Sequence, residues 1–247
     1  MDRVKTTIPG FEEMIKGGLP SSETYALIGP PGIGKTIFGL QFLYGGIKLG
    51  ENGVCVTLDE ATESLLETGK SFNWDFERFI GEEKLIFLDS SPYKGFHEDE
   101  YFIHSEDSVL GMPVFNTNNL IKNIVEAVKK VKARRLFLDC VTMIELQNRE
   151  PFSLRTDLLG LKRALKSLNV TTILSFEAKN GQVLDYMGFE AYISDGVIIL
   201  GRKDLGDRKV RYIEVLKMRH TSHIEEKRQF RITNEGIIIY PEKGPFL

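Results

Sequence analysis

The segment GPPGIGKT, residues 29–36, constrains the fold of this chain more than any other feature. It matches the pattern G-x-x-x-x-G-K-[ST], with Gly29, Gly34, Lys35 and Thr36 in the fixed positions. The apolar run TYALI precedes the segment and predicts a strand, and the apolar residues after it recur with helical spacing. A strand, a glycine-rich loop and a helix in this order are typical of a phosphate-binding loop, or P-loop.

Each residue type in the P-loop has a physical role. Glycines let the backbone curl so that successive N–H groups face phosphate oxygens, and the helix N-terminus adds a partial positive charge. We expect Lys35 to meet the β- and γ-phosphates and the Thr36 hydroxyl to ligate Mg²⁺. The sequence therefore predicts that ATP or ADP binds here with Mg²⁺. The predicted nucleotide contacts are Gly29, Pro30, Pro31, Gly32, Ile33, Gly34, Lys35, Thr36 and Ile37.

Acidic residues end two further apolar runs. In LFLD, residues 136–139, the strand ends at Asp139, which is the expected form of the second NTPase motif, whose aspartate holds Mg²⁺ through its water shell. Asp59 and Glu60 follow the predicted strand Val54–Leu58 at the same carboxyl edge of the sheet. A carboxylate there can orient and deprotonate an attacking water. The pair can equally begin the next helix, where acids suit the helix dipole.

Strands alternate with helices over residues 24–176, which predicts an α/β fold with a mostly parallel central sheet flanked by helices. From Val197 the pattern changes to strands alone, which predicts antiparallel strands added at the C-terminal edge. Residues 90–116 show no clean periodicity, and a loop of that length is usually functional or mobile. Because the chain has no linker rich in Pro, Gly or Ser, we expect residues 1–247 to form a single domain.

Composition limits the binding partners and the cellular compartment that we expect for this protein. The formal net charge is -3 and the pI is about 5.9, so no overall positive field attracts the protein to nucleic acid. The two cysteines, Cys55 and Cys140, lie in apolar runs that are typical of buried thiols. The sequence also lacks an apolar stretch of membrane-spanning length. These features favour a cytoplasmic protein without a membrane partner.

Nine stretches, in order along nearly the whole chain, resemble a KaiC-type ATPase domain of the RecA superfamily. The VLKMR segment with its downstream histidine, and the acid pair after the second strand, are specific to this family. Circadian KaiC carries two such domains in tandem, whereas this chain has one and resembles the single-domain relatives common in archaea. The nine stretches are GGLP, GPPGIGKT, GLQFLYGGI, VCVTLDEATESLL, SFNWD, ARRLFLDCVT, TTILSFE, ISDGVIIL and VLKMRHTSH.

The resemblance implies a RecA-like P-loop NTPase fold and a homohexameric ring with ATP between neighbouring subunits. It makes Glu60 the catalytic base and Asp59 its partner, although the family more often has Glu at both positions. It also implies that Lys217 and Arg219 reach the γ-phosphate of the adjacent subunit's ATP. At His220 this sequence departs from the family, which usually has glycine there. Further nucleotide contacts implied by the resemblance are Ser71 on the P-loop subunit, Met218, Thr221 and His223 from the adjacent side, and Thr233 and Asn234 near the base or ribose.

Two other functions compete with a regulatory or signalling ATPase that acts with an unidentified protein partner. One is a RecA- or RadA-like DNA-dependent ATPase in recombination or repair. The other is a nucleotide-dependent scaffold with negligible turnover, which would use the same residues. DNA binding needs an excess of Lys and Arg, but charges nearly cancel in the two loops expected to face a central channel, Leu146–Leu154 and Ala178–Tyr192. These loops contain Arg149 and Lys179 against Glu150, Asp185 and Glu190.

Overall fold

The computed structural model of the protein describes residues 2–90, 102–103, 114–115, 117–147, 151–178, 193–206 and 208–244. Nine strands form one central sheet: β3 (Thr24–Gly29), β4 (Gly53–Thr57), β5 (Leu85–Asp89), β8 (Arg135–Asp139), β9 (Thr171–Glu177), β10 (Gly196–Asp204), β11 (Lys209–Met218), β12 (Arg228–Thr233) and β13 (Gly236–Tyr240). Their order is β13-β12-β11-β10-β3-β9-β8-β4-β5. The mostly parallel centre with antiparallel strands at the C-terminal edge is therefore confirmed.

The parallel strands bring their carboxyl ends to one edge of the sheet. Gly29 at the end of β3 pairs with Glu177 of β9, and Thr57 at the end of β4 pairs with Asp139 of β8. Residues that are far apart in sequence thus meet at a single edge, where ligands bind in open α/β sheets.

One prediction about strand direction was wrong. The strand that begins near Val197, β10, runs parallel to β3 on one side and antiparallel to β11 on the other. The antiparallel part therefore begins at β11, and β12 and β13 continue it. The physical reason is that a strand buried on both faces has the same apolar pattern whichever way its neighbours run.

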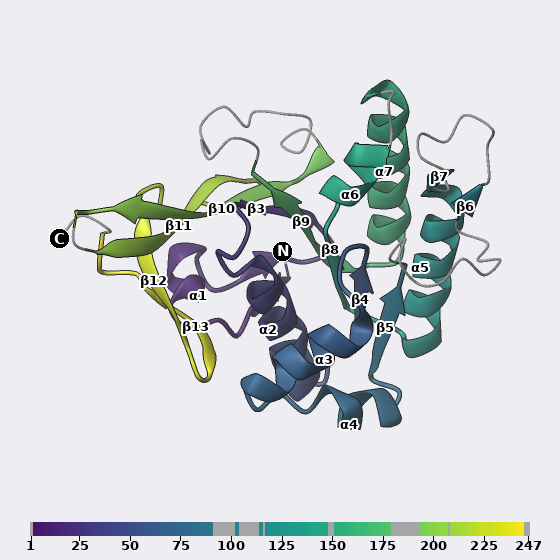
Figure 1. The fold of residues 1–247 in the computed structure, drawn as a ribbon, viewed down its shortest axis with the longest axis horizontal. Coiled ribbons are helices and arrows are strands. Elements are labelled where there is room, and N and C mark those ends of the chain that lie inside the picture. The colour runs from purple at the N-terminus through teal and green to yellow at the C-terminus, as the bar shows by residue number, and fades with distance from the viewer. Residues whose placement is uncertain are drawn as a thin grey trace.

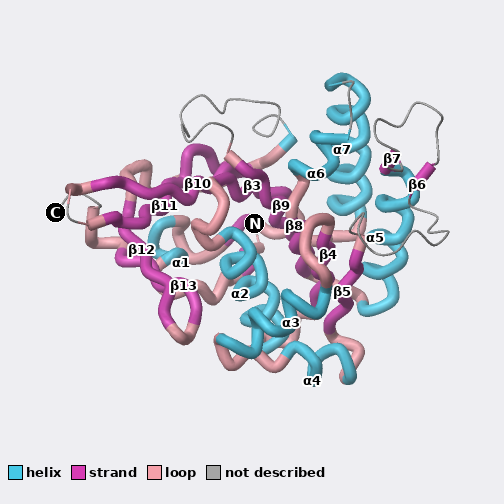
Figure 2. Tube along the Cα trace, viewed as in Figure 1, coloured by secondary structure: helices cyan, strands magenta, loops and turns pink. Residues whose placement is uncertain are grey.

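Helices cover both faces of the sheet (Figure 1). One core cluster packs the first four helices against one face, and a second cluster packs the last three against the other. Figure 2 shows the strands passing between these two groups. The helices are α1 (Phe11–Met14), α2 (Lys35–Lys48), α3 (Thr62–Ser71), α4 (Phe76–Gly81), α5 (Thr117–Val131), α6 (Thr142–Gln147) and α7 (Pro151–Ser167).

The sequence of each helix fits its position. In α5 the buried residues Leu120, Ile124 and Val128 recur every four positions, so one face meets the sheet while the lysines of the last turn stay in water. Helix α2 is buried over most of its surface. At Gly39 it lies so close to β8 that an added Cβ would sit 2.2 Å from the ring of Phe137. The absence of a side chain at this position sets the distance between α2 and the sheet.

Two short antiparallel sheets of two strands each complete the described structure. Strands β1 (Arg3–Val4) and β2 (Leu19–Pro20) pair near the N-terminus, and β6 (Phe102–Ile103) pairs with β7 (Val114–Phe115). Most of the segment 90–116, which the sequence marks as irregular, lies outside the described residues. None of the helices in the described ranges is both long and apolar enough to span a membrane.

Candidate nucleotide site

A pocket of about 410 Å³ lies at the carboxyl edge of the parallel strands. Its walls come from the P-loop, the residues after β4, the ends of β8 and β9, and Ile232 of β12. The predicted residues Pro31, Gly32, Gly34, Lys35, Thr36 and Ile37 all line it. Ile33 is fully buried in the core, so only its backbone remains to meet a ligand.

The P-loop has the backbone that its glycines predict. Gly32 and Gly34 have φ values of +67° and +120°, in the left-handed region that favours glycine. Helix α2 begins at Lys35, and no side chain caps it. Its first-turn N–H groups are therefore available to an anion, which fits the phosphate groups of a nucleotide.

Lys35 is held inside the loop. Its side chain is buried, and Nζ donates to the carbonyl oxygens of Gly29 (2.9 Å) and Pro30 (3.2 Å). These two carbonyls hold the ammonium at the start of the loop, beside the amide groups of α2. The arrangement places one positive charge among phosphate-binding amides.

Thr36 and Asp139, the two residues predicted to hold Mg²⁺, contact each other. Thr36 Oγ1 donates to Asp139 Oδ2 over 2.6 Å, and Ser175 Oγ of β9 donates to Asp139 Oδ1. Burial raises the pKa of Asp139 above its ordinary value, while the hydroxyls of Ser175 and Thr36 and the charge of Lys35 act against burial. A buried carboxylate with a hydroxyl beside it is an oxygen donor set that suits Mg²⁺.

Ser175 was missed from the sequence. Its signal is a hydroxyl residue inside the apolar run TTILSFE of β9, where a side chain without a polar partner would be unfavourable. Within the described residues no cluster of three or more His, Cys, Asp or Glu side chains is arranged to hold a metal. A magnesium ion in a nucleotide site needs only one or two carboxylates, because phosphate oxygens and waters supply the rest.

Three further carboxylates line the pocket: Asp59, Glu60 and Glu177. The Glu60 backbone N–H donates to Thr57 Oγ1 over 3.2 Å, and Ser64 Oγ donates to Glu60 Oε2 over 3.0 Å. These bonds fix the residue after β4 and orient its carboxylate. Glu177 ends β9 directly beside Gly29 of β3. Two glutamates thus line the pocket, one in the segment after β4 and one at the end of β9, and either can take a proton from a water.

Comparison with known proteins decides the family. The family model described as "ATPase: KaiC" matches residues 4–244. The chain belongs to the KaiC ATPase family. The circadian clock oscillator protein KaiC of Parathermosynechococcus lividus is 38% identical over 240 residues, which are 96% of this chain and 42% of that protein. The KaiC of Synechococcus elongatus is 36% identical over 242 residues, 97% of this chain and 44% of that protein.

This KaiC-family chain spans less than half the length of these curated relatives. It is matched from end to end by a solved structure. The crystal structure of a KaiC-like protein from the hyperthermophilic archaeon Pyrococcus horikoshii OT3 is 37% identical and has a TM-score of 0.82. The match covers 97% of this chain and 99% of that one. The fold is thus that of a KaiC-like domain of the RecA superfamily.

The KaiC-type cations Lys217 and Arg219 lie far from the P-loop of their own chain. Lys217 pairs with Val197 of β10, which in turn pairs with Ala26 of β3. Ala26 precedes Gly29 by three residues, so the cations lie about 10 Å back along the strands and two strands across. They are near the amino edge of the sheet, opposite the edge that carries the pocket.

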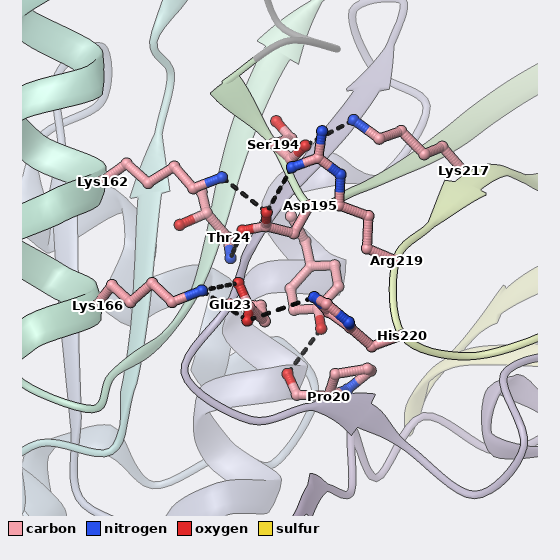
Figure 3. A network of polar contacts seen from close by, with 11 residues as sticks. Pro20, Glu23, Thr24, Lys162, Lys166, Ser194, Asp195, Lys217, Arg219 and His220 are labelled. Atoms are coloured by element: carbon pink, nitrogen blue, oxygen red, sulfur yellow. Dashed lines mark hydrogen bonds and ion pairs between the residues drawn. The ribbon is translucent and has the colours of Figure 1, made fainter. Parts of the chain in front are cut away.

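Both cations are anchored there. Lys217 Nζ donates to the Ser194 carbonyl oxygen over 2.8 Å, and Arg219 Nη1 donates to Asp195 Oδ1 over 3.2 Å (Figure 3). Met218, between them in sequence, is buried in the core, so it has only its backbone to offer a ligand. Side chains alternate between the two faces along β11, so Met218 points into the core while Lys217 and Arg219 point away from it.

The loop after β11 is tied to the N-terminal segment. Arg3 Nη2 donates to Thr221 Oγ1 over 2.8 Å, and the Ile224 N–H donates to the Met14 carbonyl. His220 has φ +66°, the left-handed conformation that glycine adopts most easily. The histidine therefore stands at a position whose backbone conformation glycine would adopt with less strain. His223, three residues later, is half-buried, and its Nδ1 is buried without a hydrogen bond to any described residue.

The remaining predicted contacts lie on the pocket side. Thr233 and Asn234 follow Ile232, which lines the pocket of the same chain. Ser71 is exposed and donates to the Thr68 carbonyl, and it is Thr68, one turn earlier on α3, that lines the pocket. The central parts of the two loops predicted to face a channel, residues 148–150 and 179–192, lie outside the described residues.

Proposed function

We propose that this KaiC-family protein hydrolyses ATP with Mg²⁺ at sites formed between two subunits. One observation carries this proposal: within a single chain, the residues that would bind and hydrolyse ATP are far from the cation that would stabilise the departing γ-phosphate. The pocket side holds Lys35, Thr36, Asp139 and Glu60, while Arg219 lies near the opposite edge of the sheet. A second subunit can present that edge to the pocket.

On the pocket side each residue has a distinct task. Lys35 and the amides of α2 bind the β- and γ-phosphates, and Thr36 with Asp139 would hold Mg²⁺. The metal, when bound, neutralises charge on the phosphate oxygens. Glu60 takes the proton of the attacking water, and Asp59 beside it is the partner of that base. Glu177 is the second candidate for the base, because it faces the same pocket.

On the neighbouring subunit, Lys217 and Arg219 would stabilise the negative charge that develops as the γ-phosphate leaves. Burial and the nearby Arg219 guanidinium lower the pKa of Lys217, while the charge of Asp195 acts against them. The Met218 backbone, Thr221 and His223 would complete this side. On the pocket side, Thr233 and Asn234 would meet the base or ribose.

The assembly that we propose is a homohexameric ring, the form that the family resemblance implies. The two core clusters lie on the two faces of one sheet, which supports a single domain over residues 1–247. Free buried thiols at Cys55 and Cys140 favour the reducing cytoplasm. We propose a regulatory or signalling role with a protein partner, rather than a DNA-dependent one, because the net charge is -3.

A steady-state phosphate-release assay tests the activity. We expect wild-type protein with Mg·ATP to release phosphate at a rate that single-stranded DNA leaves unchanged, and Lys35→Ala protein to release none above background. Stimulation by DNA would favour the recombinase function. Tight ATP binding without turnover would favour the scaffold.

A subunit-mixing experiment tests the shared site. Lys35→Ala and Arg219→Ala proteins are each expected to be inactive. Mixed under conditions that exchange subunits, some interfaces pair an intact P-loop with an intact Arg219, so partial activity should return. No recovery in rings shown to be mixed would place Arg219 outside the neighbour's site.

A further inference from the structure

A network of polar contacts lies near the amino ends of the parallel strands, and Asp195 is at its centre (Figure 3). It directly precedes β10, and only 4% of it is exposed. Its Oδ1 accepts from Lys162 Nζ of α7 at 2.7 Å and from Arg219 Nη1 at 3.2 Å, and its Oδ2 accepts from the Thr24 N–H at 3.2 Å. A single buried carboxylate therefore joins α7, β3 and the end of β11.

The backbone fixes the direction of this carboxylate independently of Arg219. The Asp195 N–H donates to the Thr24 carbonyl over 2.7 Å, and the Arg219 N–H donates to the Asp195 carbonyl over 2.8 Å. Both residues are thus locked to the sheet through the main chain. The bond between their side chains then sets where the guanidinium lies.

The other acid in this network, Glu23, hydrogen-bonds with Asp195 and is also bound by a lysine of α7. Glu23 accepts from Lys166 Nζ at 2.8 and 2.9 Å, and His220 Nε2 lies 4.0 Å from it. Burial acts to raise the pKa of Asp195, but hydrogen bonding with Glu23, Lys162 and the Thr24 amide outweighs burial and lowers that pKa to about 2. Asp195 is therefore ionised at neutral pH, with Arg219 and Lys162 as its cationic partners, while Lys166 is the cationic partner of Glu23.

Arg219 is held at one end and exposed at the other. Its side chain is 52% exposed, whereas that of Asp195 is 6% exposed. A guanidinium has five N–H donors in a rigid plane, so binding through Nη1 leaves donors for a second anion. Four cations, Lys162, Lys166, Lys217 and Arg219, surround the two acids Asp195 and Glu23, so the cluster stays positive toward an approaching phosphate.

We infer that Asp195 is the positioning residue of Arg219, holding its guanidinium ready for the γ-phosphate of the neighbouring subunit. This inference rests on the proposed function. Arginine has many rotamers, and fixing one of them in advance removes an entropy loss from the step in which the phosphate is stabilised. Asp195 itself touches no nucleotide.

The first test is a double-variant cycle on the full-length protein. Asp195→Asn keeps the shape of the side chain and removes its charge. We expect it to lower kcat on the order of 10-fold, the effect of losing one hydrogen bond to a charged group, with little change in KM for ATP. If Asp195 acts through Arg219, then Asp195→Asn/Arg219→Ala protein should have the same rate as Arg219→Ala protein. An additional loss in the double variant would indicate a merely structural role and overturn the inference.

Glu214→Gln is the matched control. It removes the charge of another half-buried carboxylate on β11, which pairs with Lys227 over 3.5 Å, without touching Asp195 or Arg219. We expect its rate to stay at the wild-type level. Thermal unfolding must show each variant folded at the assay temperature, and Asp195→Ser, whose smaller side chain fits the same space, replaces Asp195→Asn if that variant unfolds. A wild-type rate in either Asp195 variant would also overturn the inference.

The second test locates the effect in the subunit that donates Arg219. Arg219→Ala protein mixed with Lys35→Ala protein should recover activity, but mixed with Lys35→Ala/Asp195→Asn protein it should recover roughly tenfold less. Equal recovery in both mixtures would exclude a positioning role in the donor subunit. If neither mixture recovers, the shared site is what fails, and the double-variant cycle still decides whether Asp195 acts through Arg219.

Discussion

Thr36 Oγ1 donates a hydrogen bond to Asp139 Oδ2 over 2.6 Å, although 103 positions separate the two residues in the sequence. The contact joins the first turn of α2 to the end of β8. Asp139 is 7% exposed, and burial raises its pKa. A carboxylate that is ionised here without a metal therefore lowers the stability of the folded protein.

Asp139→Asn should separate stability from activity. We expect the variant without nucleotide to unfold at the wild-type temperature or above, because a buried charge is gone, while Mg²⁺-dependent phosphate release is lost. Thermal scans with and without Mg·ATP check this, since the wild-type protein should gain stability from Mg·ATP and the variant much less.

The same group predicts a pH dependence. The pKa of Asp139 is higher in the folded protein than its ordinary value of 3.8, which applies in the unfolded chain. Folding therefore becomes less favourable as the pH rises from 3.8 through the folded-state pKa. The unfolding temperature of Asp139→Asn relative to wild type should therefore be higher at pH 7.5 than at pH 4. A difference that shrinks with rising pH would contradict the direction of the shift.

Lys35→Ala should weaken nucleotide binding. It removes the buried ammonium that the Gly29 and Pro30 carbonyls hold inside the P-loop. Loss of a charged hydrogen-bonding group from a phosphate site corresponds to a Kd about 10- to 100-fold higher. Calorimetry with Mg·ADP measures this, and Lys48→Ala at the other end of α2 is the control. An unchanged Kd for Mg·ADP would contradict the assignment of the P-loop as the nucleotide site.

Glu60→Gln and Glu177→Gln distinguish the two candidate bases. Each substitution keeps the shape and removes the proton acceptor, so the variant that lacks the true base should bind ATP and hydrolyse it about 10²- to 10⁴-fold more slowly. We expect this of Glu60→Gln, with Glu177→Gln retaining most of the rate. The reverse result would assign the base to the end of β9.

Two glycines test the packing of α2 and α7. Gly39→Ala places a methyl group against the buried ring of Phe137, so it should lower the free energy of unfolding by about 1–3 kcal/mol. Gly160→Ala on α7 meets open space, so it should raise that free energy by up to about 1 kcal/mol through helix propensity. Denaturant unfolding of the two variants measures both effects.

The sequence predicted the P-loop and the strand and helix on either side of it well, because their signals are local. Whether a backbone curls at Gly32 and Gly34 depends on those residues, and Lys35 follows them directly into α2. The predicted strand over residues 24–28 differs from β3 by one residue. The ends of β4 and β8 were also evident, because an acid that follows an apolar run is visible without knowledge of the partner strand.

Tertiary structure alone decided the relationships between distant segments. The direction of β10, the bond from Ser175 to Asp139, and the anchoring of Arg219 by Asp195 depend on which strands become neighbours. Composition and periodicity describe what a residue needs, namely burial or a polar partner, but several distant residues can meet the same need. The sequence by itself thus determined the P-loop and an α/β fold, while long-range strand pairing decided which side chains line the pocket beside it and which edge of the sheet carries Lys217 and Arg219.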